Sequence, residues 1–222
     1  MISKIFQSEY LKRLDNIKQW AEIDTFKEES VSQHSYKVVI FGRILLEDIF
    51  GFNKDPKILS FKLACIDAFM FHDWDEALIL RDISHETKYN QFNGSVIRSV
   101  LNDLSRHIAL NEFFEPYNED EKASSPSSDM ITFNIIGQTS DVKLICKLAD
   151  WISLCFYMKR EMCLGNRGIY EKWIYSKNEV QHSLDAVKNM LKSRFVGYDL
   201  NFNELDNLIL NIYGEAKEAN ND

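Results

Sequence analysis

The sequence predicts an all-α protein, and three observations lead to this expectation. The 222 residues include only 3 prolines and 8 glycines, which is few for a chain made of many short strands and turns. Apolar residues recur at three- and four-residue spacing, as they do on the buried face of a helix. Helix-capping residues precede several of these segments. A chain of this length can form one well-buried core, so we expect one domain over residues 1–222.

The first two helices are predicted from spacing and from a capping signal. Leucine, isoleucine and tryptophan recur with helical spacing near residues 8–20. Ser30 is followed three residues later by Gln33, a pattern typical of a capping box, in which each side chain accepts a hydrogen bond from the other's backbone amide. A largely apolar helix should therefore run over Val31–Phe50 and end at the glycine that follows.

The later segments are also predicted to be helical, apart from one loop. Asp55-Pro56 should begin the third helix, because aspartate caps free amides and proline fits the first helical position. This helix should run to about Phe71 and, being apolar on most sides, lie centrally. Residues 115–130 are polar, with two prolines and a serine cluster, which indicates an exposed loop. The domain core should span about 8–193. Further helices are expected near 94–113, 142–164, 170–193 and 203–217.

The charge and hydropathy of the chain argue against two classes of partner. The net charge is −8, and a nucleic-acid backbone is bound by clustered positive charge, so we expect no nucleic-acid partner. No run of about 18 apolar residues occurs, so we expect no membrane span. The first residues lack the apolar core of a signal peptide. The four cysteines form no C-x-x-C pair. These features predict a cytoplasmic protein in a reducing compartment.

An adjacent histidine and aspartate indicate where the chemistry of this protein lies. His72-Asp73, with Glu76 one helical turn beyond, follows an apolar stretch and places polar groups where the chain otherwise resembles core. A metal ion would explain that arrangement, because imidazole nitrogen and carboxylate oxygen are both good ligands for divalent cations. His34, in the first turn of the second helix, and Asp150 supply a second histidine and a second aspartate.

Asp150 is informative because its neighbours on the predicted 142–164 helix are largely apolar. A buried carboxylate without a partner costs several kcal/mol, roughly, so a partner is expected. The partner could be a metal ion. It could equally be a backbone amide or a lysine, and the spacing alone does not decide between them.

The motifs around these residues resemble those of a known family, the HD-domain phosphohydrolases, and within it the bacterial 5′-deoxynucleotidase type. The similarity covers about residues 8–170, with the motifs in the family's order. The matching segments are V-S-Q-H at 31–34, F-H-D-W-D-E at 71–76, D-I-S-H-E-T-K-Y at 82–89, K-L-A-D at 147–150, Glu161, and G-N at 165–166.

The resemblance implies a single all-α helical bundle with the metal site in its core, and a homodimer. One divalent ion would be bound, and the ligand set accepts Mn, Co, Fe, Ni, Zn or Mg. By resemblance, the metal ligands would be His34, His72, Asp73 and Asp150. Glu76 would serve the hydrolytic water or the leaving group, and Asp82 would hold the water or the sugar. Lys88 would contact a phosphate, and Trp20 would line the sugar or, equally, pack into the core.

The chain departs from the family pattern where the substrate should bind. Gln19, with Lys18 alongside, stands where the family has an arginine before its tryptophan. L-I-L-R before Asp82 replaces a shorter glycine-containing segment. His85 replaces a threonine and could contact phosphate or donate a proton, or it could be a surface residue. We therefore expect the family's metal chemistry with an altered choice of substrate.

These observations predict a metal-dependent hydrolase that removes the 5′-phosphate from deoxynucleoside monophosphates. The alternatives are a deoxynucleoside triphosphate or polyphosphate hydrolase on the same fold, and a nucleotide-sensing module with weak or no catalysis. An oxygenase with two irons ranks low, because it needs further histidine ligands that the sequence does not supply.

Overall fold

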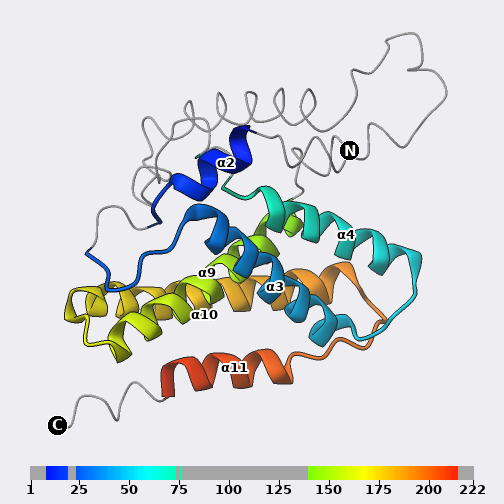
Figure 1. Cartoon of the computed structure of the whole chain (residues 1–222). Helices are drawn as coiled ribbons and strands as arrows, with labels where there is room; N and C mark the ends of the chain where they lie inside the picture. The colour runs from blue at the N-terminus through cyan, green and yellow to red at the C-terminus, as the bar shows by residue number, and fades with distance from the viewer. Residues whose placement is uncertain (1–8, 20–23, 74–75, 77–139, 215–222) are drawn as a thin grey trace, which may run out of the picture. The chain divides into compact units, whose positions relative to one another are not determined.

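The structure, a computed structural model, describes residues 9–19, 24–73, 76 and 140–214 (Figure 1). All named elements in these ranges are helical, which confirms the predicted all-α fold class. The predicted helix near 94–113 and the loop at 115–130 lie outside the described residues. The elements are α2 (Glu9–Asn16), α3 (Val31–Phe50), α4 (Pro56–Phe71), α9 (Ser140–Cys163), the short 3-10 helix η2 (Arg167–Ile169), α10 (Tyr170–Arg194) and α11 (Asn203–Gly214).

The chain divides into two compact units. The first consists of Met1–Asp24, Glu28–Ser35 and Phe71–Gln138. The second consists of Thr25–Lys27, Tyr36–Met70 and Thr139–Asp222. No helix in the described part of the chain is long and apolar enough to cross a bilayer.

In the first unit, α2 ends earlier than its sequence predicts. The apolar spacing continues to residue 20, but the helix ends at Asn16. The backbone then pairs with a later segment instead: the Gln19 amide donates to the Glu29 carbonyl at 2.8 Å, and the Val31 amide donates to the Ile17 carbonyl at 2.9 Å. Lys18 thus forms an isolated antiparallel bridge with Ser30, and these partners replace the hydrogen bonds that a longer helix would make beyond Ile17.

The start of α3 confirms the predicted capping box. The Ser30 amide donates to Gln33 Oε1 at 3.2 Å, and the Gln33 amide donates to Ser30 Oγ at 3.3 Å. The helix then runs over Val31–Phe50, as the sequence predicts. His34 thus lies on the first turn of a helix whose start is fixed by two reciprocal bonds.

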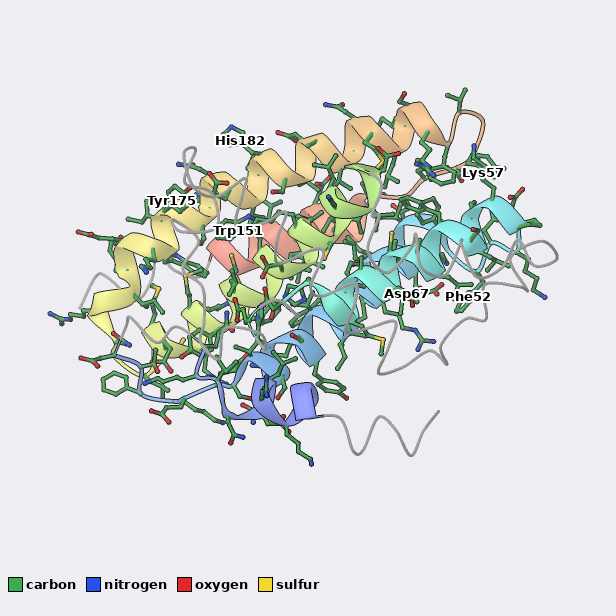
Figure 2. All side chains as sticks on the ribbon, turned by 90° about the horizontal axis from the view of Figure 1, so that it is seen from above. Phe52, Lys57, Asp67, Trp151, Tyr175 and His182 are labelled. Atoms are coloured by element: carbon green, nitrogen blue, oxygen red, sulfur yellow. The ribbon has the colours of Figure 1, made fainter. Side chains whose placement is uncertain are left out.

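In the second unit, α9 packs against α10 and α11. The predicted start of α4 is confirmed, because Asp55 Oδ1 accepts a hydrogen bond from the Lys57 amide at 2.8 Å. Near this end of the unit, the rings of Phe50, Phe61 and Phe195 meet with centroids 5.0–6.0 Å apart. Figure 2 shows Trp151, Tyr175 and His182 among the side chains of α9 and α10, and His182 is exposed.

Helices α3 and α4 approach each other closely at Gly42, and a substitution there tests how tightly the two helices pack. A Cβ added at Gly42 would lie 2.3 Å from the ring of the fully buried Phe69. Alanine normally stabilises a helix relative to glycine by about 1 kcal/mol. Overpacking against a buried ring costs about 1–3 kcal/mol. We therefore expect Gly42→Ala to lower the melting temperature by a few degrees, roughly.

Thermal unfolding followed by circular dichroism measures this effect. The neighbouring exposed residue Arg43 provides the control, because Arg43→Ala changes the same helix without filling the contact. A melting temperature for Gly42→Ala equal to or above that of the wild type would show that the two helices do not approach so closely.

Candidate metal centre

The end of α4 brings His72 and Asp73 together. Adjacent residues inside a helix point about 100° apart, so they do not converge on one point. Here the helix ends at Phe71, and the two residues lie in the turn that follows. His72 Nε2 lies 3.0 Å from Asp73 Oδ2. Because the helix has ended, the side chains of these two adjacent residues can approach each other.

His34 reaches the same carboxylate oxygen from α3. Its Nε2 lies 3.9 Å from Asp73 Oδ2, and the rings of His34 and His72 have centroids 5.3 Å apart at an interplanar angle of 64°. Side-chain exposure is 2% for His34, 9% for His72 and 8% for Asp73. Three ionisable side chains are thus removed from water together, which is costly unless a charged partner compensates.

The spacing of these atoms fits a shared metal ion. Ligand atoms held about 2.1 Å from one ion lie about 3.0 Å apart at a right angle and about 4.2 Å apart on opposite sides. The two distances to Asp73 Oδ2, 3.0 Å from His72 Nε2 and 3.9 Å from His34 Nε2, fall in this span. Both imidazoles present Nε2, a common ligand atom in metal sites. Among the described residues, those whose ligand atoms all lie within 4.8 Å of one another are His34, His72 and Asp150; Asp73 is outside this group, and its distances to the two imidazoles are also those of ion pairs.

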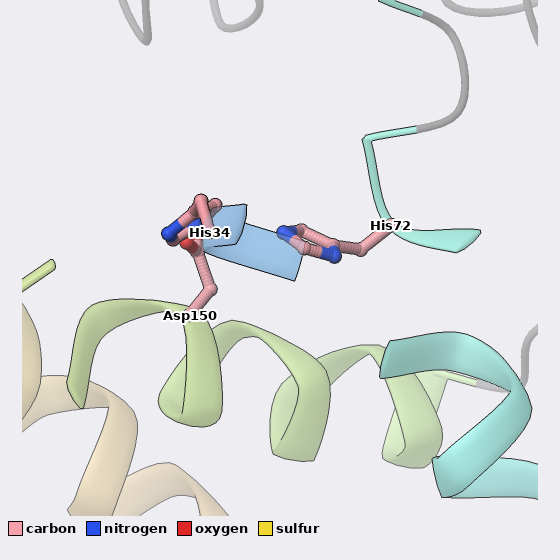
Figure 3. A group of neighbouring side chains, drawn as sticks. All are labelled: His34, His72 and Asp150. Carbon is pink, nitrogen blue, oxygen red and sulfur yellow. The ribbon is translucent and has the colours of Figure 1, made fainter. Parts of the chain in front are cut away.

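Asp150 lies on α9, where the sequence left open a metal or a lysine partner. Lys147 Nζ, one turn earlier, lies 3.3 Å from Asp150 Oδ2, so the lysine interaction is present. One ligand atom of Asp150 also lies within 4.8 Å of ligand atoms of His34 and His72 (Figure 3). A carboxylate has about four lone-pair sites, so one lysine contact leaves others for a cation.

Glu76 is the buried acid of the motif. It is 1% exposed, and its amide donates to the Asp73 carbonyl at 3.1 Å, which fixes its backbone one turn after His72-Asp73. A buried carboxylate three residues after a candidate metal ligand is a candidate for proton exchange at the site.

The predicted substrate residues are only partly described. Lys18 is half-buried and pairs with Glu28 at 3.0 Å, a partner that its sequence context did not reveal. Gln19 is 9% exposed, and its buried Oε1 has no hydrogen-bond partner within the described ranges. The remaining candidates, Trp20, Asp82, His85 and Lys88, lie outside the described residues, so their roles stay predictions.

Comparison with known proteins assigns a family to this helical protein with its histidine and aspartate centre. The sequence model of the YfbR-like 5′-deoxynucleotidases matches residues 6–198. The chain therefore belongs to the YfbR-like 5′-deoxynucleotidase family, as its motifs predict, and it is a metal-dependent phosphohydrolase acting on phosphoric ester bonds.

Two further comparisons complete these findings. No curated protein sequence gives a significant match. Among solved structures, the chain is similar to an HD-domain phosphohydrolase from Listeria innocua. The sequence identity is 20%, the match covers 95% of this chain and 97% of that chain, and the TM-score is 0.49.

Proposed function

We propose that this protein removes the 5′-phosphate from deoxynucleoside monophosphates, using one divalent cation bound by His34, His72, Asp73 and Asp150. The observation that carries the proposal is the convergence of His34 and His72 on Asp73 in a chain that belongs to the deoxynucleotidase family. We include in the proposal the homodimer and the cytoplasmic location expected from the sequence.

The site supplies what phosphoryl transfer needs. A divalent cation lowers the pKa of water that it coordinates and offsets negative charge on a phosphoryl oxygen. Catalysis at phosphorus otherwise depends mainly on positioning and electrostatics, so few protein groups are required. The burial of His34, His72 and Asp73 keeps these groups in a low-dielectric setting, where their electrostatic effects are larger than in water.

Glu76 is the proposed proton carrier. Its carboxylate would take a proton from the attacking water or give one to the departing 5′-oxygen. Its burial and its place one turn after Asp73 support this role, because a buried carboxylate near the proposed ligands in sequence has few other functions to serve. Asp82 would hold the water or the sugar, and Lys88 and His85 would contact phosphate.

Gln19, in place of the family's arginine, leaves open a second candidate, a triphosphate or polyphosphate hydrolase. An amide carries no charge, so it does not neutralise a monophosphate as an arginine would. The altered residue is buried, and its carbonyl oxygen has no hydrogen-bond partner in the described part of the chain, so it would accept a hydrogen bond from a hydroxyl or amino group of the nucleoside rather than from an ionised phosphate.

Incubating the metal-loaded protein with deoxynucleoside mono-, di- and triphosphates tests these functions. We expect inorganic phosphate from the monophosphates and the free deoxynucleoside as the other product. Pyrophosphate or triphosphate as a product would favour the second candidate. Nucleotide binding without release of any phosphate would indicate a sensing module and contradict the proposal.

Substitution of Gln19 should change the stability of the protein and its KM for the nucleotide in ways that can be measured separately. Gln19 Oε1 has no hydrogen-bond partner among the residues that the structure describes, and a buried polar atom left without one costs about 1–3 kcal/mol, so Gln19→Leu should raise the free energy of unfolding of the substrate-free protein. If Gln19 Oε1 accepts a hydrogen bond from the substrate, the same variant should raise KM for the nucleotide. Chemical denaturation and steady-state kinetics measure the two effects.

A variant that is less stable but has an unchanged KM would show that Gln19 is structural. The companion exchange Gln19→Arg should increase kcat/KM for monophosphates, because it restores the positive charge of the family pattern. Unchanged or poorer kinetics on monophosphates would contradict that explanation.

A further inference from the structure

Two side chains of α9 hold a short backbone segment that comes more than a hundred residues earlier in the chain. Glu161 accepts hydrogen bonds from two consecutive amides, with Oε2 2.7 Å from the Phe26 nitrogen and Oε1 3.0 Å from the Lys27 nitrogen. Tyr157 OH donates to the Lys27 carbonyl oxygen at 3.1 Å. Because residues 157 and 161 lie one turn apart on the same helix face, they form one anchor for residues 26–27.

Glu161 is itself fixed. It is fully buried, with 0% exposure, and Asn166 Nδ2 donates to its Oε2 at 3.1 Å. Burial raises the pKa of Glu161, but the hydrogen bonds from Asn166 and the two amides outweigh this effect, so the pKa lies below its ordinary value. The carboxylate is therefore ionised at neutral pH, the form that accepts strong hydrogen bonds.

The glycine and asparagine after α9 place the Asn166 side chain. Gly165 adopts a positive φ of 94°, and its amide donates to the Met162 carbonyl at 2.9 Å. The Asn166 amide donates to the Glu161 carbonyl at 3.0 Å. This pair of bonds is the Schellman ending of a helix, which favours glycine at the left-handed position. The spacing of Glu161, Gly165 and Asn166 therefore brings the Asn166 side chain to the Glu161 carboxylate, which it holds in place.

The anchored segment belongs to the connection that carries the substrate-side residues. Residues 26–27 continue directly to Glu28, whose side chain pairs with Lys18 at 3.0 Å. The next residue, Glu29, accepts the backbone hydrogen bond from Gln19. Gln19 Oε1 is buried and has no hydrogen-bond partner among the residues described. The chain anchored at residues 26–27 therefore leads within two residues to the backbone partner of Gln19.

Asp150 lies on the same helix as the anchor. It precedes Tyr157 by seven residues and Glu161 by eleven, spacings close to two and three helical turns. One rigid helix thus carries a candidate metal ligand and the anchor of the substrate-side connection at a fixed separation.

We infer that Glu161, with Tyr157 and Asn166, is a positioning residue for the nucleoside part of the substrate, because it fixes residues 26–27, which lead to the residues that pair with Lys18 and Gln19. This inference rests on the proposed function. It assigns the anchor no role in metal binding or in proton transfer.

Glu161→Gln tests the inference. A carboxamide directs an NH₂ group toward backbone donors where the carboxylate offered an acceptor, so one of the two amide bonds is lost. We expect KM for a deoxynucleoside monophosphate to rise about tenfold or more, while kcat and the metal content stay close to the wild type. KM for p-nitrophenyl phosphate, which has no nucleoside, should stay unchanged. Hydrogen exchange at the Phe26 and Lys27 amides should become faster.

Two further variants keep the inference falsifiable. Tyr157→Phe removes one hydrogen bond and keeps the ring, so it should raise the nucleotide KM less than Glu161→Gln does and remain folded. Glu171→Gln changes an exposed glutamate at the start of α10 and should change neither KM nor exchange. An unchanged nucleotide KM in a Glu161→Gln protein whose amides exchange faster would overturn the inference. An equal rise in KM for both substrates, or loss of the metal, would also overturn it.

A failure of the proposed function can be distinguished from a failure of this inference by the activity of the wild type. In that case the wild type would release no phosphate from any monophosphate. The inference would then be tested by the dissociation constant of a deoxynucleoside monophosphate, measured by calorimetry. Glu161→Gln should weaken that binding by about the same factor, and an unchanged constant would overturn the inference.

Discussion

Replacing His72 with alanine should remove the divalent cation and reduce phosphate release at least about a thousandfold. His72 Nε2 lies 3.0 Å from Asp73 Oδ2, so the imidazole forms one side of the predicted coordination sphere. The cation contributes several kcal/mol of charge stabilisation in the transition state, and each 1.36 kcal/mol is a tenfold change in rate, roughly. Metal analysis after gel filtration and the rate of phosphate release measure the two losses.

His182→Ala is the matched control for this variant. His182 is an exposed histidine on α10, so its loss should leave metal content and rate unchanged. A His72→Ala protein that keeps a full equivalent of metal and its rate would show that His72 is not a ligand.

Metal analysis also shows whether the partner of Asp150 is the cation or Lys147. Asp150→Asn should lose the cation, whereas Lys147→Ala should keep it, because the lysine lies 3.3 Å from Asp150 Oδ2 without being a ligand. If both variants bind metal as the wild type does, the lysine is the partner that matters and the four-ligand proposal is wrong.

Glu76→Gln should keep the cation and lose turnover. The amide is nearly isosteric with the carboxylate but cannot accept a proton at neutral pH, so general acid or base catalysis is removed while the packing is kept. Such catalysis contributes about 10²- to 10⁴-fold, and kcat should fall by this factor. Because Glu76 is not one of the proposed ligands, metal content should stay at one equivalent.

Glu171→Gln, an exposed change on α10, controls for a general effect of removing a carboxylate. Normal hydrolysis by the Glu76→Gln protein would show that our assignment of this residue is wrong. Loss of the cation together with activity would instead make Glu76 a ligand or a structural support of the site.

The sequence was sufficient for features that depend on local chemistry. The capping box at Ser30 and Gln33 and the aspartate cap at Asp55 predicted where α3 and α4 begin, because each signal acts within a few residues of the chain. The pairing of His72 with Asp73 was visible for the same reason. The end of α4 beside them supplies the turn that lets neighbours in sequence share one oxygen.

Features that depend on distant partners could not be predicted in this way. Apolar spacing continued the first helix to residue 20, but backbone pairing of Gln19 with Glu29 ends it at Asn16. Glu161 was recognised only as part of a motif. Its partners are the amides of Phe26 and Lys27, which no local pattern links to it.

The central claim is that one cation, held by two histidines and two aspartates, receives the phosphate of a deoxynucleoside monophosphate. A crystal structure of the Mn²⁺-loaded protein with a non-hydrolysable monophosphate analogue, with anomalous data, tests it most directly. We predict one anomalous peak about 2.0–2.2 Å from ligand atoms of His34, His72, Asp73 and Asp150, with a phosphate oxygen as a further ligand. No peak at these residues, or a peak there with the base rather than the phosphate facing it, would contradict the account.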